Sequence, residues 1–244
     1  MATLIPSLGS CMARMTPGEY QVAQRLEEKL GDDYLLWYDV PTGPARVQPD
    51  FIVLHPRRGL LILEVRDWSL KIIHRAEPHY WQLFANRLLT ARPNPVQEAK
   101  RSAQAVVNAL RRDPQLLDAD CQDATRLRFP WSYGVVFPEL TRQEFTNAQL
   151  GRFIEPQQVL CSDEMLPTVE PAELQSRLWD MFPLMMGGSL SPAQRDRLRW
   201  ILFPEVRLAQ DAPFDDQDKS AALPELMPVL DLAQEQLARS HSGG

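Results

Sequence analysis

The chain has 244 residues, of which 44% are hydrophobic and 24% are charged, close to the averages of soluble globular proteins. This composition excludes the collagen-like, disordered and low-complexity classes, and the net charge of −6 argues against indiscriminate binding of polyanions. No apolar run approaches the roughly 20 residues of a membrane-spanning helix, so we expect no membrane partner.

The N-terminus and the cysteines indicate the compartment. No basic residue precedes an apolar stretch at the N-terminus, so we expect neither a secretory signal nor a transit peptide. Cys11, Cys121 and Cys161 are odd in number and form no CxxC pair, which favours reduced thiols. A cytoplasmic protein is therefore predicted.

The first long helix has clear signals at both ends. Thr16 is a suitable N-cap, Pro17 suits the first helical position, and Glu19 stands three residues after the cap. Apolar residues then recur at helical spacing as far as Leu30, and Gly31 ends the pattern. The spacing predicts a helix that packs through one apolar stripe.

Three strands are predicted next. Residues 34–40 are rich in aromatic and β-branched side chains, and residues 51–55 and 60–65 are apolar at nearly every position. The turn-forming residues 56–59 join the last two strands into a hairpin. Because both strands lack polar alternation, we expect them in the centre of a sheet that is covered by helices on both faces.

The rest of the chain continues the alternation of strands and helices. Further strands are predicted at residues 70–74, 79–83, 131–137 and 159–160, and further helices at 94–113, 171–181 and 192–203. An acidic linker at 209–228 and a helix at 230–240 are predicted to follow. The predicted fold class is α/β, with a mixed central sheet flanked by helices and a helical C-terminal extension.

Charge is unevenly distributed along the chain. Residues 51–112 contain eleven basic and four acidic residues, and most of the basic ones are arginine, whose planar guanidinium suits phosphate oxygens. This stretch is either a face for nucleic acid or an ordinary solvated face. The candidates for DNA binding are Arg57, Arg58, Lys71, Lys100 and Arg101.

The predicted hairpin brings two acidic residues together at its open end. A turn with its midpoint at position 57 or 57.5 makes the numbers of facing residues sum to 114 or 115, so Asp50 faces Glu64 or Val65. Facing residues have Cβ atoms about 4.5–5.5 Å apart, so the two carboxylates repel unless a cation lies between them. A hard divalent ion such as Mg²⁺ fits such a gap.

Arg66 adds a positive charge to this acidic pair. It lies two residues beyond Glu64 and therefore points to the same side of the strand. An acid pair beside a cation suits phosphodiester hydrolysis. Alternatively, Asp50 caps the end of a strand while Glu64 pairs with Arg66 or Arg58, and the spacing alone leaves both interpretations open.

Four sequence blocks in a fixed order carry a family resemblance. They are Gly18-Glu19, the run PDFIVL at 49–54, the run GLLILEVRDW at 59–68, and Asn94-Pro95-Val96-Gln97. Together they resemble the nuclease-related domain, NERD, a family of the restriction-endonuclease-like PD-(D/E)XK superfamily. The resemblance covers residues 16–137.

The resemblance implies a set of functional residues. Its catalytic residues are Glu19, Asp50, Glu64, Arg66 and Gln97. It implies that Asp50, Glu64 and the main-chain carbonyl of Val65 hold Mg²⁺ or Mn²⁺. Glu19 and Gln97 also stand three residues after Thr16 and Asn94, so each fits a helix capping box as well.

Arg66 departs from the family pattern, which has lysine at this position. Lysine can lose its proton when buried, whereas arginine stays charged and only stabilises negative charge. The sequence thus allows two functions. One is a Mg²⁺-dependent DNA endonuclease or nuclease-like module, and the other is a catalytically weak or inactive module that binds DNA or docks on a partner.

A second resemblance lies near the C-terminus. Residues 228–239 are similar to the glutamine-bearing segment that precedes the Walker A loop in NERD-linked superfamily I DNA helicases. No GxxxxGK[ST] loop occurs in the 244 residues. We expect that the sequence stops at a domain boundary and that its partners are DNA and the helicase domain of the same full-length polypeptide.

The expected organisation follows from these resemblances: an N-terminal segment at 1–15, the nuclease-related core at 16–137, a sheet-edge strand and helical extension at 138–208, and an acidic linker with a helix at 209–244. Other chemistries lack support, because the sequence contains no HExxH, GxSxG or GxGxxG motif. The six tryptophans are expected in the core, with Trp68 and Trp81 as the two candidates for contact with bases.

Overall fold

The computed structural model describes residues 1–43, 46–119, 121–123, 125–183 and 189–203. The predicted linker at 209–228 and the predicted helix at 230–240 lie outside the described residues. Among the described residues, no helix has both the length and the apolar character needed to cross a membrane.

Within the described part, six strands form one mixed sheet in the order β1-β2-β3-β4-β8-β9. The strands are β1 (Thr3–Ile5), β2 (Leu35–Tyr38), β3 (Phe51–His55), β4 (Gly59–Val65), β8 (Trp131–Phe137) and β9 (Val159–Cys161). β3 pairs antiparallel with β2 and β4, whereas β1 with β2, β4 with β8, and β8 with β9 are parallel pairs.

The β3–β4 hairpin lies at the centre of this sheet, as predicted. Phe51 faces Leu63, so the numbers of facing residues sum to 114, and every residue of both strands is buried. Gly59 closes the turn with a φ of +113°, and a Cβ there would lie 2.2 Å from the carbonyl oxygen of Pro130. Only glycine fits this backbone and this close approach.

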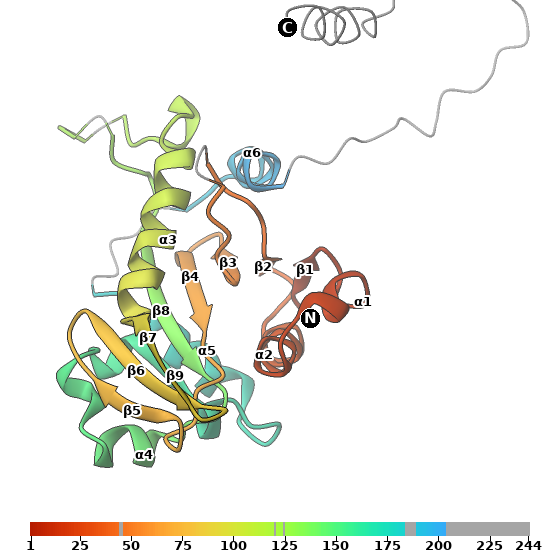
Figure 1. Cartoon of the computed structure of the whole chain (residues 1–244). Helices are drawn as coiled ribbons and strands as arrows, with labels where there is room; N and C mark the ends of the chain where they lie inside the picture. Colours follow the sequence, from red (N-terminus) through yellow and green to blue (C-terminus); the bar gives the residue numbers. More distant parts are fainter. Residues whose placement is uncertain (44–45, 120, 124, 184–188, 204–244) are drawn as a thin grey trace, which may run out of the picture. The chain divides into compact units, whose positions relative to one another are not determined.

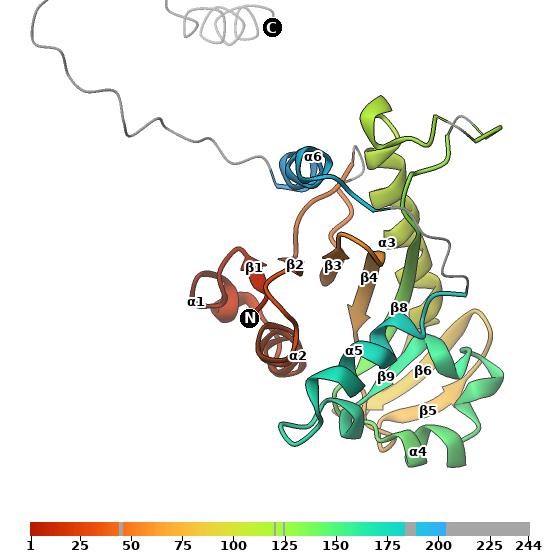
Figure 2. The same ribbon diagram turned by 180° about the vertical axis from the view of Figure 1, so that it is seen from behind.

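Helices cover both faces of the sheet, which explains the continuous apolar runs. On one face, α2 (Pro17–Lys29) and α5 (Pro171–Trp179) bury side chains against Phe51. On the other face, α3 (Pro95–Leu110) and α6 (Pro192–Leu202) pack against Ile52. Figures 1 and 2 show the central strands between these two layers.

A second, smaller sheet is inserted between β4 and α3. In the described part it consists of the antiparallel strands β5 (Ile73–Ala76), β6 (Tyr80–Ala85) and β7 (Leu88–Pro93). Trp81 is fully buried beneath it and stacks on Phe137 of β8, with ring centroids 6.0 Å apart. In Figure 1 this sheet lies at the end of α3 where that helix begins.

The remaining described helices are short. They are α1 (Leu8–Cys11), α4 (Arg142–Asn147) and the 3-10 turns Met12–Arg14, Pro114–Leu116, Leu150–Arg152, Pro156–Gln158 and Ser162–Met165. The prediction missed β1, β7, α1 and α4, because strands and helices of three to six residues carry too little periodicity to be recognised. The predicted α/β class with a mixed, helix-flanked sheet is confirmed.

Candidate active site at the open end of the central hairpin

Three elements bring the candidate site together. Asp50 directly precedes β3, Glu64 lies in β4, and Arg66 follows β4. From the other side, α3 contributes Glu98 and Ser102, which are four residues apart and therefore share one face of the helix. The hairpin register places Asp50 opposite Glu64, which is one of the two partners that the sequence allowed.

The guanidinium of Arg66 lies at the centre of this group. Its Nη1 donates to Oδ2 of Asp50 at 3.1 Å and to the carbonyl oxygen of Val65 at 2.6 Å. Its Nη2 donates to Oε2 of Glu64 at 3.0 Å and to Oε2 of Glu98 at 2.8 Å, and its Nε donates to Glu98 at 3.3 Å. Arg66 therefore contacts the three groups that the resemblance implies as metal ligands.

Further hydrogen bonds fix the two acidic side chains. The amide of Val65 donates to Oδ2 of Asp50 at 2.7 Å, and the hydroxyl of Ser102 donates to Oε1 of Glu64 at 2.6 Å. The Glu64 side chain is only 7% exposed, whereas those of Asp50 and Arg66 are 20% and 18% exposed. The site is thus held rigidly and opens to solvent on the Asp50 side.

Negative charge exceeds positive charge in the site. Among the described residues, the carboxylates of Asp50, Glu64 and Glu98 share the single guanidinium of Arg66. Burial and the nearby charge of Glu64 raise the pKa of Asp50 to about 8, although Arg66 acts in the opposite direction. Burial acts to lower the pKa of Arg66, but Glu64 and Asp50 outweigh it and raise that pKa.

Glu19 has both a structural and a positional role. It forms the capping box of α2 with Thr16, and its Oε2 also accepts a hydrogen bond from the Tyr38 hydroxyl at 2.8 Å. Burial, followed by this contact, raises the pKa of Tyr38. Glu19 is also close enough to Asp50 to raise the pKa of that carboxyl. The capping alternative is therefore confirmed, and the residue borders the site.

No hydrogen bond joins Gln97 to Asp50 or Glu64 in the described part of the chain. It is exposed on α3 and makes no capping box with Asn94, which instead accepts from the Val96 amide. Together with Lys100 and Arg152 it lines a separate pocket of about 220 Å³. The structure brings Glu98, the next residue, against Arg66. The sequence analysis missed Glu98. Its only signal is its position four residues before Ser102, a polar residue on the buried face of α3.

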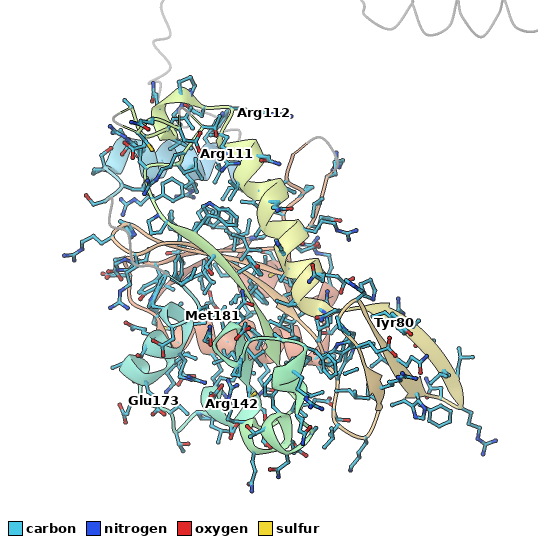
Figure 3. All side chains as sticks on the ribbon, turned by 90° about the vertical axis from the view of Figure 1, so that its left-hand side faces the viewer. Tyr80, Arg111, Arg112, Arg142, Glu173 and Met181 are labelled. Carbon is cyan, nitrogen blue, oxygen red and sulfur yellow. The ribbon has the colours of Figure 1, made fainter. Side chains whose placement is uncertain are left out.

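The predicted DNA-binding residues are dispersed. Arg57 and Arg58 lie at the turn of the β3–β4 hairpin, which is the end opposite Glu64, and Arg58 packs over Trp179. Lys71, Lys100 and Arg101 are exposed on the loop before β5 and on α3. Figure 3 shows Arg111 and Arg112 at the far end of α3 from the small sheet that carries Tyr80. The basic stretch of the sequence is not one surface.

The tryptophans only partly match the expectation. Trp81 is fully buried, which confirms a core role and makes contact with bases wrong for this residue. Trp68 is half-buried and packs against Trp81. Trp200, expected in the core, is 58% exposed because it lies on the outer side of α6.

The site has the chemistry of a divalent-cation site, but its centre is held by arginine. Carboxylate and carbonyl oxygens are the ligands that Mg²⁺ prefers, and the excess negative charge favours a cation. No group of three or more His, Cys, Asp or Glu side chains in the described part is arranged to hold a metal ion. Asp50, Glu64 and the Val65 carbonyl offer oxygens of this type, and the Arg66 guanidinium contacts the same oxygens.

Comparison with known proteins identifies the family. The model of the family described as "Nuclease-related domain", NERD, matches residues 15–138. No curated protein and no solved structure matches the chain. The matched segment contains Asp50, Glu64, Arg66 and Glu98 and spans just over half of the sequence. The chain therefore belongs to the nuclease-related domain family.

Proposed function

We propose that this chain is a nuclease module that hydrolyses phosphodiester bonds of DNA and depends on Mg²⁺ or Mn²⁺. The observation that carries this proposal is the convergence of Asp50, Glu64 and the Val65 carbonyl on a single cationic group. Catalysis of this reaction needs positive charge beside the phosphate, and these three groups offer oxygens that can bind a cation there.

The residues of the site have separable tasks in this proposal. Asp50, Glu64 and the Val65 carbonyl would hold the ion, which when bound lowers the pKa of a water and offsets charge on the phosphate. Ser102 orients Glu64 through its 2.6 Å hydrogen bond. Arg66, once it leaves part of its carboxylate contacts, places a permanent positive charge against a phosphate oxygen.

A second candidate function follows from the hydrogen bonds of the Arg66 guanidinium. Its Nη1, Nη2 and Nε all have acceptors in the site, so the centre is stable as an internal ion network without a metal. In this case the chain is a catalytically silent module that binds DNA or docks on a helicase partner. Arginine in place of the family lysine favours this second function.

We further propose attachment to a helicase domain in the same polypeptide. The support is the sequence likeness of residues 228–239 to the segment before the Walker A loop of NERD-linked helicases. Sequencing the reading frame beyond Gly244 tests this proposal. A GxxxxGK[ST] loop soon after that point supports it, and a stop codon there contradicts it. The cytoplasmic location also stays a prediction.

A nicking assay tests the nuclease proposal. Supercoiled and single-stranded DNA are incubated with Mg²⁺, with Mn²⁺ or with EDTA, and the wild type is compared with Glu64→Gln and Arg66→Lys. We expect metal-dependent nicking that Glu64→Gln abolishes. Glu173→Gln on α5 makes the same chemical change at an exposed position and should leave the rate unchanged. DNA binding with no cleavage under any metal supports the second candidate.

A further inference from the structure

Residues 80–84 of β6 alternate between a buried and an exposed face, whereas β7 is exposed at most positions. Trp81 and Leu83 of β6 point inward and are 0% and 6% exposed. Because side chains alternate along a strand, Tyr80 and Phe84 point to the opposite face, where they are 40% and 51% exposed. Phe84 faces Leu89 of β7, which is 49% exposed, so the outer face presents aromatic and apolar surface.

Basic side chains accompany these aromatic ones. Arg75 of β5 faces Gln82, which lies between Tyr80 and Phe84 on the outer face. The Arg75 side chain is 65% exposed and forms an ion pair with Glu77. The segment from 69 to 93 contains one acidic residue, Glu77, in a chain that is acidic overall. Its basic residues are Lys71, Arg75, Arg87 and Arg92, of which Arg75 lies on the outer face and Arg92, which faces Trp81, lies on the inner one. This charge complements a polyanion.

The sheet is joined directly to the candidate active site. It begins seven residues after Arg66, and β7 leads through Asn94 into α3, which carries Glu98. The Asn94 side chain is fully buried and donates to the carbonyl oxygens of Pro78 and Phe153 at 3.0 and 3.1 Å. The chain thus enters the sheet after Arg66 and leaves it before Glu98, two residues that contact each other in the site.

We propose that the outer face of the β5–β7 sheet binds single-stranded DNA and presents it to the site at the end of β4. Exposed aromatic rings between basic side chains are the means by which proteins hold unpaired bases, which offer their flat faces for stacking. Tyr80 and Phe84 are four residues apart on one strand, or about 13 Å, which spans two to three nucleotides. Paired bases inside a duplex cannot stack on them.

This inference deepens the proposed function by naming its substrate, yet DNA binding can be measured without cleavage. The assay is fluorescence anisotropy of a labelled 20-nucleotide oligothymidylate and of a matched duplex, in EDTA at fixed salt. The test variant is Tyr80→Ser with Phe84→Ser. Trp200→Ser removes an equally exposed aromatic ring from α6 and serves as the control. Tyr80→Phe with Phe84→Tyr keeps both rings in place.

We expect the wild type to prefer the single strand and the double serine variant to bind it at least about 10-fold more weakly, as loss of base stacking predicts. The control and the ring-preserving variant should bind like the wild type. Arg75→Gln should reduce the salt dependence of binding by about one ion. Equal thermal midpoints for all the variants show that the losses do not come from unfolding.

Unchanged affinity in the double serine variant, or a wild type that prefers the duplex, overturns the inference. Retention of a protein partner by this face, without single-strand binding, also overturns it. Separate readouts distinguish the two proposals, because binding is measured in EDTA, where the metal-dependent reaction does not run, and cleavage is measured with Mg²⁺ or Mn²⁺. If neither the wild type nor any variant cleaves DNA but loss of the Tyr80 and Phe84 rings still weakens binding, the nuclease proposal fails and this inference stands.

Discussion

Arg66 and Asp50 form an ion pair of 3.1 Å at the point where the resemblance to nucleases implies a metal ion. The same guanidinium reaches Glu64 at 3.0 Å and Glu98 at 2.8 Å. The chain therefore supplies its own cation to an acidic cluster, and a divalent ion must compete with a side chain that is covalently attached to the site.

Removal of the arginine charge should make the protein depend on added metal for stability. Arg66→Met leaves Asp50, Glu64 and Glu98 facing one another in a largely buried site. Breaking a buried ion pair from one side typically costs about 3–5 kcal/mol. We predict a loss of this size in the free energy of unfolding in EDTA, with much of it regained in millimolar Mg²⁺ because the ion binds only the folded state. Urea titrations measure both values.

The wild type and one surface variant provide the comparison for this prediction. Arg14→Met breaks an exposed ion pair with Asp39, and it should cost less than about 1 kcal/mol with no response to Mg²⁺. The wild type should also respond little. Equal stability of Arg66→Met with and without Mg²⁺ would show that the acidic cluster does not take up the ion.

The pKa of Asp50 predicts a specific dependence of stability on pH. This pKa is about 8 in the folded chain against an ordinary value of 3.8, so the folded state holds a proton that the unfolded state releases. The contribution of Asp50 to stability is complete below about pH 4 and is lost as the pH rises through 8. Asp50→Asn keeps an oxygen for Arg66 and the Val65 amide but does not titrate.

We therefore expect Asp50→Asn to gain stability relative to the wild type as the pH rises from 4 to 9 in EDTA. The difference between the two proteins removes the contributions of carboxylates that do not interact with Asp50. Urea unfolding at pH 4, 6, 7.5 and 9 gives that difference directly. A difference that is flat across this range, or that falls with rising pH, is incompatible with a raised pKa at Asp50.

The close packing of the start of α2 against Asp67 requires glycine at position 18. The Gly18 amide donates to Asp67 at 3.1 Å, and a Cβ at position 18 would lie 1.9 Å from Oδ1 of Asp67. Gly18→Ala should destabilise the fold by about 1–3 kcal/mol through overpacking. Gly9→Ala, where a Cβ meets no atom within 4 Å, should be nearly neutral. Similar thermal midpoints for the two variants would rule out this tight contact.

The central hairpin could be predicted from sequence because its signals are local. An apolar run, a four-residue turn and a second apolar run limit the register to two choices, and the observed one places Asp50 opposite Glu64. Sequence also gave the correct side of the strand for Arg66, and the interpretation in which Glu64 pairs with Arg66 is borne out. This pairing coexists with the meeting of Asp50 and Glu64.

The rest of the site depends on contacts that no local pattern reveals. Glu98 reaches Arg66 only because the small sheet returns the chain to the end of β4, and its strand β7 is exposed at most positions. The resemblance points to Gln97, whereas α3 places Glu98 against Arg66. Charge density along the sequence likewise failed to predict a surface, because the hairpin separates Arg58 from Glu64 by its full length.

The most direct test of the central claim is the nicking of supercoiled DNA by the wild type and by Glu64→Gln in Mg²⁺ and Mn²⁺. A nuclease centre at Asp50 and Glu64 predicts open-circular product that appears with metal, disappears in EDTA and is lost in Glu64→Gln. Intact supercoiled DNA with the wild type in both metals, or equal nicking by Glu64→Gln, would contradict it.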